Sequence, residues 1–374
     1  MNNWIEIAED NLAANFRTLQ AAAGPDTEIL AVVKANAYGH GAELCSQILA
    51  RAGARWLGVT SASEGVRVRQ ALGKAPMQIL VMSGFLPDDV PLLHEFSLTP
   101  TAWTTEHIQW LAPNPLPVHV EVDTGMGRQG ATPGSELVEL FAQMNAAKIP
   151  LDGIFTHFCS TEEANSPLTQ TQQIRFEHTV TQSLDLKPKW VHAGNSSTVD
   201  NPAQPTPWLT ALSASVGARA MVRPGIALYG YCLPIGGPGT PHVLPALRPV
   251  MTWKAKILSV RSLAPGETVG YNATFIAQTL MRVALIPAGY ADGLRRELSS
   301  TNTKPGGWVM IQGQRAPILG RISMNLTVVD VTDIPNVAPN DEAILLGPGI
   351  TADDHARLAN TIAYEILCGI HPCG

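Results

Sequence analysis

The chain has 374 residues, enough for two domains, and its 45% hydrophobic and 15% charged residues are typical of a folded protein rather than a disordered one. Its net charge of −6, without any run of Lys and Arg, argues against a nucleic-acid binder, because phosphate contact needs clustered cations. The longest apolar stretches have the length of strands, so we expect no transmembrane helix and no membrane partner.

Residues 1 to about 235 alternate short apolar runs with segments of helical period. Two of those segments, NLAANFRTL and SELVELFAQM, place apolar side chains on one helical face: Leu12, Phe16 and Leu19 in the first, and Leu137, Leu140, Phe141 and Met144 in the second. The predicted strands are the runs around 30–34 and at 56–60, 77–82, 96–100, 118–122, 152–157, 189–193 and 226–230. Strands that alternate with helices pair in parallel, and eight of them close a barrel. We therefore expect an N-terminal (β/α)8 TIM-type barrel, with a doubly wound open sheet as the alternative.

The composition and the periodicity of the sequence change after this segment. Residues 233–249, LPIGGPGTPHVLPALRP, are dense in proline and glycine and predict a linker or a long surface loop. Beyond them, alternating runs such as MTWKAKILSVRSL, MRVALIPAGY, GWVMIQ, ISMNLTVVDVTD and DEAILLG predict a mainly antiparallel β domain. One helix, DDHARLANTIAYEIL, closes it, with Asp353 or Asp354 placed to cap its start. The predicted domains are residues 1–235 and 236–374.

The cysteines and the N-terminal residues indicate the cellular compartment in which we expect the protein. The five cysteines, at positions 45, 159, 232, 368 and 373, are odd in number and widely spaced, which favours reduced thiols over disulfides. Cys368, His371 and Cys373 are too few for a convincing zinc site, so we prefer a frayed C-terminus and assign no metal. The opening residues, MNNWIEIAED, lack the basic and apolar regions of a signal peptide. We expect a cytoplasmic protein.

Unusual polar residues fall where the predicted strands end. In a parallel barrel, functional groups collect at the carboxyl ends of the strands. In strand order these residues are Lys34, then Arg128 of EVDTGMGRQG, His157 of GIFTHF, His192, Asn195 and Ser196 of HAGNSS, and Arg223, Gly225 and Ile226, which open the eighth predicted strand. Taken singly, each has an ordinary structural explanation. Five coincidences in strand order predict a site at this end of the barrel.

The residues of this site indicate a phosphorylated cofactor. The small residues of HAGNSS and the glycine of RPGI can present backbone N–H groups to a phosphate, and Tyr38 can donate its phenol. A buried ammonium is costly unless it is paired or neutralised, and a lysine that forms a Schiff base avoids that cost. A Schiff-base lysine beside a phosphate site points to pyridoxal 5'-phosphate, although barrels host many phosphate ligands.

Seven motifs carry a resemblance to a known family. AVVKANAYGHG, VDTGMGR, GIFTHF, VRPGIALYG, VGYNATF, IPAGYADG and GRISMN resemble, in the same order, the successive motifs of alanine racemases, from about residue 4 to 367. The resemblance implies a pyridoxal-phosphate-dependent isomerase that interconverts L-alanine and D-alanine, a small-molecule substrate, and so supplies D-alanine for peptidoglycan. It also implies a homodimer whose C-terminal β domains supply residues to the partner's active site.

The resemblance also implies roles for single residues around the cofactor. Lys34 would hold the cofactor as a Schiff base, and Arg223 would face its pyridine nitrogen, with His157 linking Arg223 to a tyrosine. An arginine can only donate, so it disfavours protonation of the ring and limits side reactions. The phosphate would be held by Tyr38, Ser196, Gly225, Ile226 and Tyr364, and Asn195 belongs to the same cofactor-binding group.

Racemisation requires a proton to leave one face of Cα and another to arrive on the opposite face. The residues that match the two bases of the family are Lys34 and Tyr271, the latter from the partner subunit. Without the resemblance, Tyr271 would be interpreted as an ordinary strand tyrosine. Arg128 and the backbone of Met324 would bind the substrate carboxylate. Tyr290 and Arg321 would line the entrance, and Tyr364 with Tyr271 would narrow it.

The sequence departs from the family pattern at three places. Glu121 stands where many members carry a carbamylated lysine, so we expect a Glu121–Arg128 pair. Asn325 replaces the usual aspartate of the SMN motif, which makes a broad-specificity or serine-accepting racemase an alternative. The arginine-containing C-terminal strand of the family is missing from AYEILCGIHPCG.

Three rival functions follow from the same residues. A pyridoxal-phosphate barrel decarboxylase would carry an acidic residue at the pyridine nitrogen, and Arg223 argues against it. A non-catalytic cofactor-binding barrel would lack the second domain that contains Tyr271. A structural or interaction role with a dead site is disfavoured because Lys34 and Tyr271 are both present.

Overall fold

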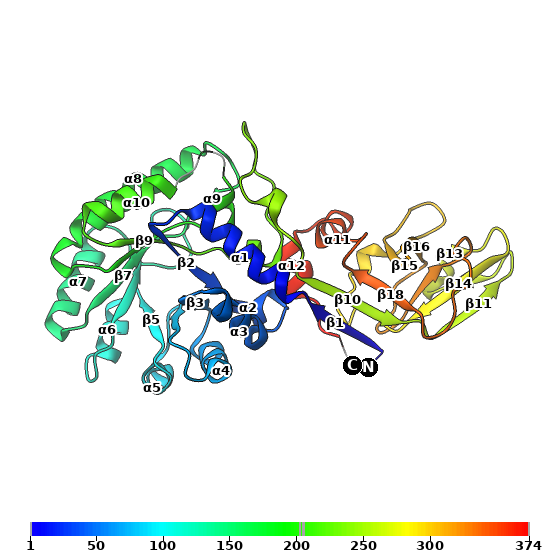
Figure 1. Cartoon of the computed structure of the whole chain (residues 1–374), viewed down its shortest axis with the longest axis horizontal. Coiled ribbons are helices and arrows are strands. Elements are labelled where there is room, and N and C mark those ends of the chain that lie inside the picture. Colours follow the sequence, from blue (N-terminus) through cyan, green and yellow to red (C-terminus); the bar gives the residue numbers. More distant parts are fainter. Residues whose placement is uncertain (1, 202, 204–205, 373–374) are drawn as a thin grey trace. The chain divides into compact units, whose positions relative to one another are not determined.

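The computed structural model describes residues 2–201, 203 and 206–372, which form two compact units. The barrel unit consists of residues 9–37 and 41–248, and the β unit of the described residues in 1–8, 38–40 and 249–374 (Figure 1). None of the described helices is long and apolar enough to cross a membrane. The functional division inferred from the sequence, at residue 235, stays a prediction.

The barrel unit is built on a closed parallel barrel of eight strands. Its strands are β2 (Thr27–Val32), β3 (Trp56–Val59), β4 (Gln78–Val81), β5 (Thr99–Ala102), β6 (Val118–Glu121), β7 (Leu151–Phe155), β8 (Trp190–His192) and β9 (Arg219–Val222). The barrel closes where β9 pairs with β2. The predicted TIM-type barrel is confirmed, and the open sheet is excluded.

The eighth strand was predicted at the wrong place. The strand that closes the barrel is Arg219–Val222, and the predicted run forms the 3-10 turn η3 (Ile226–Tyr229) instead. Pro224 has no N–H to donate to a ladder, so the strand ends before it. Arg223 therefore follows the last strand rather than opening it. The run predicted at 96–100 is also displaced, because α5 (Val90–Glu95) continues to its border and β5 begins only at Thr99.

The helices of the barrel unit alternate with its strands along the chain. They are α1 (Glu9–Ala23), α3 (Ala42–Ala52), α4 (Ala62–Leu72), α5, α6 (Thr105–Leu111), α7 (Ser135–Ala147), α8 (Pro167–Gln182) and α10 (Thr206–Ser215), with the short α2 (Lys34–Tyr38) and α9 (Ser196–Asp200) and the 3-10 turns η1 (Pro87–Asp89), η2 (Leu184–Leu186) and η4 (Leu244–Ala246). Both predicted amphipathic helices are confirmed, because α1 and α7 bury the apolar positions named above. Burial of a large apolar side chain stabilises the fold by about 1.5–3 kcal/mol.

The proline-rich connection after the barrel is largely irregular, as predicted, and the barrel unit anchors it. The carboxylate of Asp200, at the end of α9, accepts hydrogen bonds from the backbone N–H groups of Val243 and Leu244 at 2.7 and 3.0 Å. Asp200 is buried, so these bonds compensate part of the cost of desolvating its charge.

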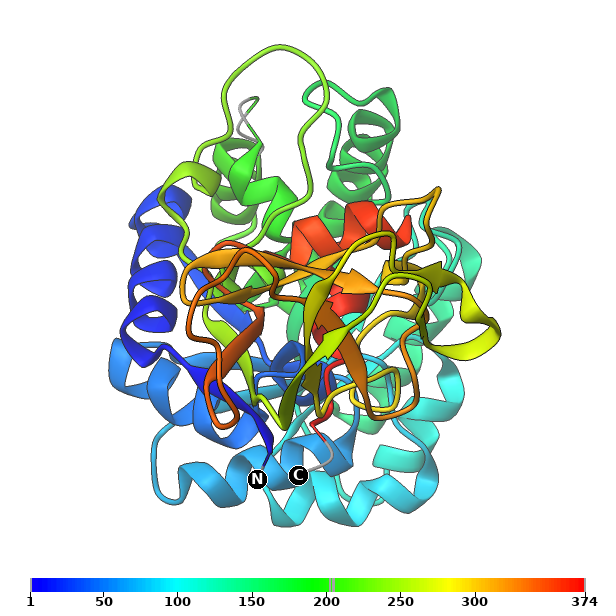
Figure 2. The ribbon, with the colours of Figure 1, turned by 90° about the vertical axis from the view of Figure 1, so that its right-hand side faces the viewer.

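The β unit contains an antiparallel sheet of eight strands in the order β1-β10-β18-β15-β16-β17-β14-β11. Figure 2 draws the strands of this unit as arrows. The strands are β1 (Asn3–Ile7), β10 (Met251–Lys256), β11 (Ser259–Leu263), β14 (Met281–Ile286), β15 (Trp308–Ile311), β16 (Gln314–Leu319), β17 (Thr327–Asp330) and β18 (Glu342–Leu346), beside a hairpin of β12 (Thr268–Val269) and β13 (Phe275–Ile276) and the turns η5 (Tyr271–Ala273) and η6 (Arg296–Leu298). The predicted antiparallel β domain is confirmed. Its first strand comes from the N-terminus, because β1 pairs with β10.

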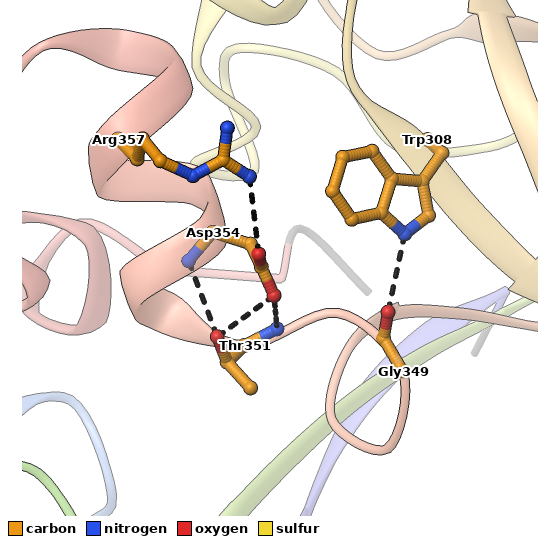
Figure 3. Close-up of polar contacts among 5 residues, drawn as sticks. All are labelled: Trp308, Gly349, Thr351, Asp354 and Arg357. Carbon is orange, nitrogen blue, oxygen red and sulfur yellow. Dashed lines mark hydrogen bonds and ion pairs between the residues drawn. The ribbon is translucent and has the colours of Figure 1, made fainter.

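The predicted C-terminal helix is two helices, α11 (Ala352–Ala359) and α12 (Ala363–Cys368). Asn360 ends α11 in the left-handed region, at φ 53°. The helix cap is Thr351, neither Asp353 nor Asp354 (Figure 3). The Thr351 hydroxyl accepts from the N–H of Asp354 at 3.1 Å, and the Asp354 carboxylate accepts from the N–H of Thr351 at 3.0 Å. Cys373, named above with the C-terminal thiols, lies outside the described residues.

This reciprocal cap gives a first prediction, on stability. Replacing Thr351 by alanine removes the hydroxyl that satisfies a helix N–H, so the free energy of unfolding of the β unit should fall by about 1 kcal/mol. Urea unfolding of the variant measures the change. Asp353→Ala is the matched control, because Asp353 takes no part in the cap and should change stability by less than about 0.5 kcal/mol. Equal losses for both variants would contradict the assignment.

Candidate active site

The barrel brings most of the sequence-predicted residues to one end. Lys34 follows β2, Glu121 is the last residue of β6, His192 is the last residue of β8 and Arg223 follows β9. All four strands belong to one closed parallel barrel, so their carboxyl ends lie at the same mouth. Whether these residues act on a ligand depends on the local geometry around each.

A left-handed turn follows Lys34. Ala35, Asn36, Ala37 and Tyr38 all have φ between 52° and 54°. This conformation costs a residue with a side chain about 1–2 kcal/mol. The surrounding hydrogen bonds impose it: the Glu64 carboxylate accepts from the N–H groups of Ala35 and Thr60, both at 2.8 Å. Such strain clusters at functional sites, and here it fixes the backbone beside Lys34.

Glu64 was missed from the sequence, although a signal for it exists. Ser61 and Glu64 form an S-x-x-E pattern at the start of α4, which predicts a capping box. The Ser61 half is present, because its hydroxyl accepts from the N–H of Glu64 at 3.3 Å. The Glu64 carboxylate instead accepts from the N–H groups of Thr60, which precedes the cap, and of Ala35, in the turn after Lys34.

A second group of donors lies between α9 and η3. The buried hydroxyl oxygen of Ser196 accepts from the N–H groups of Gly225 and Ala227 at 3.0 and 3.1 Å. The N–H of Ile226, between them in the same buried turn, has no hydrogen-bond partner among the residues that the structure describes. Asn195 caps α9 by accepting from the N–H of Thr198 at 3.1 Å. An unpaired buried donor beside a serine hydroxyl fits an anionic group such as a phosphate.

Arg223 is held by three contacts in the barrel interior. Its Nη1 donates to Nδ1 of His192 at 3.0 Å, and its Nη2 donates to the carbonyl oxygen of Thr156 at 2.7 Å. Its guanidinium carbon lies 4.8 Å from the centre of the Phe155 ring. Burial lowers the pKa of Arg223 to about 10, so the group remains a cation at neutral pH. A fixed cation of this kind can only donate to a ligand.

The histidine that contacts Arg223 is His192, whereas the resemblance implied His157. His157 follows β7, and its backbone carbonyl accepts from Gln172 at 2.9 Å. Burial, with Arg223 nearby, lowers the pKa of His157 to about 3, so its ring is neutral. The ring of His157 makes no hydrogen bond to any described residue, and its cofactor role stays a prediction.

The expected Glu121–Arg128 pair is not formed. The Glu121 carboxylate receives a hydrogen bond from Nε2 of Gln129, which also donates to the carbonyl oxygen of Met82 at 3.0 Å. Arg128 is exposed and has no ion pair within the described part of the chain. Burial raises the pKa of Glu121 to about 7, against the opposing effect of Gln129. A neutral amide satisfies this buried carboxyl without the desolvation cost of a second ion.

Two tyrosines predicted to bind phosphate meet within the β unit. The ring centres of Tyr38 and Tyr364 lie 6.0 Å apart. Burial raises the pKa of Tyr38 well above its ordinary value, and Tyr364 and Cys368 act in the same direction. The phenol is therefore neutral and keeps the proton that it would donate. Gly39 is required beside it, because a Cβ there would lie 2.3 Å from the carbonyl oxygen of Leu367.

The remaining predicted residues lie in neighbouring loops of the β unit. The N–H of Tyr290 donates to the carbonyl oxygen of Ser323 at 3.1 Å, which places Tyr290 beside Met324. A Cβ on Gly270, which precedes Tyr271, would lie 3.0 Å from the backbone nitrogen of Arg321. Tyr271, Tyr290 and Met324 are 65%, 44% and 56% exposed. Exposed large side chains gathered in this way are typical of an interaction surface.

Comparison with known proteins identifies the family. Residues 7–233 match the model of the alanine racemase N-terminal domain, and residues 250–373 match that of the C-terminal domain. The alanine racemase of Halothermothrix orenii is 34% identical over 383 residues, covering 98% of this chain and 94% of that protein.

Two solved structures extend the comparison. The alanine racemase of Clostridium difficile 630 superposes with a TM-score of 0.85 at 29% identity, covering 99% of this chain and 93% of that one. The enzyme of Bartonella henselae, described with covalently bound pyridoxal phosphate, has a TM-score of 0.82 at 29% identity over 100% and 98% of the two chains.

Proposed function

The chain belongs to the alanine racemase family and is an isomerase that acts on amino acids, and on this premise we propose that it interconverts L-alanine and D-alanine with pyridoxal 5'-phosphate bound at the barrel mouth. The cofactor, when bound, supplies the electron sink that stabilises the carbanion left at Cα. The Bartonella henselae structure, with its covalently bound cofactor, supports this choice.

The observation that carries the proposal is the placement of three groups at the carboxyl ends of the strands. Lys34 follows β2 beside a strained turn, and its amine is the group that would bind the cofactor covalently. Ser196 offers the phosphate its hydroxyl and Ile226 its unpaired backbone N–H, and Gly225, whose N–H donates to the Ser196 oxygen, orients that hydroxyl. Arg223 is fixed as a cation and would donate to the pyridine nitrogen, which keeps charge off the ring and limits transamination.

Two proton-transfer groups are required because the proton leaves one face of Cα and arrives on the other. Lys34 would act on one face, and Tyr271 of a second subunit on the other. The exposure of Tyr271, 65% in a single chain, supports this assignment, because the phenol is accessible to another molecule. The active protein is then a homodimer with shared sites.

The substrate contacts follow the same division. Arg128 and the backbone of Met324 would bind the carboxylate, and Tyr290 and Arg321 would line the entrance, which Tyr271 and Tyr364 narrow to favour a methyl side chain. Asn325 lowers the charge near the entrance, so serine is the second substrate to test. We place the enzyme in the cytoplasm, where D-alanine would be made for peptidoglycan.

The direct test of this function, our second prediction, uses the purified protein with added pyridoxal phosphate. Incubation with L-alanine should abolish optical activity, and L-serine should react more slowly. Borohydride reduction followed by peptide mapping should place the cofactor label on Lys34. Bound cofactor without turnover of either amino acid would favour a binding protein, and a label at another lysine would refute the assignment of the site.

A further inference from the structure

A line of buried polar side chains runs through the barrel from Arg223 to the opposite end. Nδ1 of His192 accepts from Arg223 at 3.0 Å, and Nε2 of His192 lies 2.8 Å from Nδ1 of His119. Nε2 of His119 faces a carboxylate oxygen of Asp152 at 3.5 Å. His119 and His192 are fully buried, whereas the side chain of Asp152 is 13% exposed.

The strands account for the direction of this line. His192 is the last residue of β8, and Arg223 follows β9, so both lie at the carboxyl ends. His119 and Asp152 are each the second residue of their strands, β6 and β7. The line therefore joins the mouth of the barrel to its amino-terminal end, where Asp152 lines a cleft with Lys189 and Trp190.

With both histidines neutral, only one placement of their ring protons is compatible with the hydrogen bonds of this line. Arg223 can only donate, so Nδ1 of His192 is an acceptor, and the proton of a neutral His192 sits on Nε2. That proton is donated to Nδ1 of His119, which leaves the His119 proton on Nε2, facing Asp152. Within the described residues Nε2 of His119 makes no hydrogen bond of good geometry, and the Asp152 carboxylate oxygen at 3.5 Å is the acceptor that it faces.

The charges of the groups agree with this arrangement. Burial lowers the pKa of both histidines, and Arg223 acts in the same direction on each, so both rings are neutral at pH 7. Burial alone would raise the pKa of Asp152, but the contacts with His119 and Lys189 outweigh it and hold the pKa at about 2. An anion therefore stands at one end and a cation at the other.

Packing keeps the two rings in place. A Cβ on Gly153 would lie 2.6 Å from the His119 ring, so only glycine leaves room for it. Trp56 covers His119 with ring centres 5.3 Å apart, and Phe155 stacks on His192 at 4.5 Å. Gly153 is the register partner of His119 across β6 and β7, so the glycine that leaves room for the His119 ring lies directly beside it on the neighbouring strand.

We propose that Asp152 and His119 are positioning residues for Arg223, relaying the charge of the carboxylate through two neutral imidazoles to the guanidinium at the barrel mouth. The relay commits one Nη1–H of Arg223 to His192 and so fixes which of its donors is left for a ligand. Hydrogen bonds in such a buried chain polarise one another, so loss of a member changes the donor strength of Arg223. The effect on the reaction rests on the proposed function, whereas the arrangement of protons does not.

The first test measures the protons directly. In apoprotein labelled with 15N-histidine at pH 7, two-dimensional 1H–15N spectra should show both His119 and His192 protonated on Nε2 and unprotonated on Nδ1. Single replacement of each histidine assigns the signals. A proton on Nδ1 of either ring, or a doubly protonated ring, would overturn the proposal, whatever the enzyme catalyses.

The second test measures the consequence at the mouth. His119→Phe removes the acceptor of His192, Asp152→Asn removes the charge, and Gly153→Ala displaces the His119 ring without changing a polar group. In each holoenzyme we expect kcat to fall about 10-fold with KM within about twofold, and the 15N shift of the cofactor's pyridine nitrogen to move. The matched controls are His178→Phe and Asp185→Asn at exposed positions. These two variants should change neither kcat nor the 15N shift of the pyridine nitrogen.

The outcomes separate the two proposals. Wild-type rates and an unmoved pyridine signal in all three variants, with racemisation intact, would refute the positioning role alone. If the wild-type protein neither binds the cofactor nor racemises alanine, the proposed function fails, and the histidine spectra still decide the relay. If the variants do not fold, the wild-type apoprotein spectra remain the deciding measurement.

Discussion

Replacing Lys34 by alanine should lower the rate of alanine racemisation by at least about 10³-fold, because the amine both holds the cofactor and moves a proton at Cα. The structure adds a reason why no neighbour can substitute. The backbone beside position 34 is fixed in a left-handed turn by Glu64, so another amine cannot be carried there by a small shift. Loss of optical activity of L-alanine, followed over time with cofactor in excess, measures the rate.

Two controls give this prediction its specificity. Lys74→Ala removes an exposed lysine from the same unit and should leave the rate within about twofold of the wild type. Added methylamine should restore part of the activity of the Lys34→Ala protein, since a free amine can replace the missing base. A Lys34→Ala protein that retains more than a tenth of the wild-type rate would show that the reaction does not pass through this side chain.

The barrel was predictable because its signals are local and repeated. Apolar runs of strand length alternate with helices whose buried face follows the 3.6-residue period, as in α1 and α7. The errors fall where pairing outweighs local composition. The run at 226–230 is as apolar as a strand, but the ladder partners in β2 and β8 are taken by residues 219–222, and Pro224 ends that strand. The break at Asn360 likewise depends on a single left-handed residue.

The chemistry of the site was predictable only by residue type and order. Lys34 and Arg223 stand at strand ends, where a barrel places functional groups. The hydrogen-bond partners of these groups were not predictable from the sequence. His192 rather than His157 reaches Arg223, and Gln129 rather than Arg128 reaches Glu121, because contacts across the barrel depend on side-chain direction, which strand order does not define. The His119–Asp152 contact joins two strands at their far ends, where no functional residue was sought.

Replacing Tyr271 by phenylalanine should leave the bound cofactor in place and slow racemisation by about 10³-fold, most strongly from L-alanine, because only the phenol oxygen is lost. Tyr271 is 65% exposed in one chain, so the change should not disturb folding. The absorbance of the bound cofactor and the rates from L-alanine and from D-alanine are the measurements. Tyr290→Phe is the matched control, because it removes a phenol from the neighbouring loop and should have the smaller effect on rate. Equal, full rates in both directions would refute the two-base assignment.

Mixing the two inactive variants decides whether Tyr271 acts across subunits. In a heterodimer of Lys34→Ala and Tyr271→Phe chains, one site lacks both groups, while the other combines an intact Lys34 with the intact Tyr271 of the partner. Random association of equal amounts makes half of the dimers mixed, each with one working site of two, so activity should return to about a quarter of the wild-type level. If Tyr271 acts within its own chain, every site stays damaged and no activity returns. A mixture of Lys34→Ala with the Lys34→Ala/Tyr271→Phe double variant can form no intact site under either arrangement, so any activity it gained would have to come from something other than a shared site.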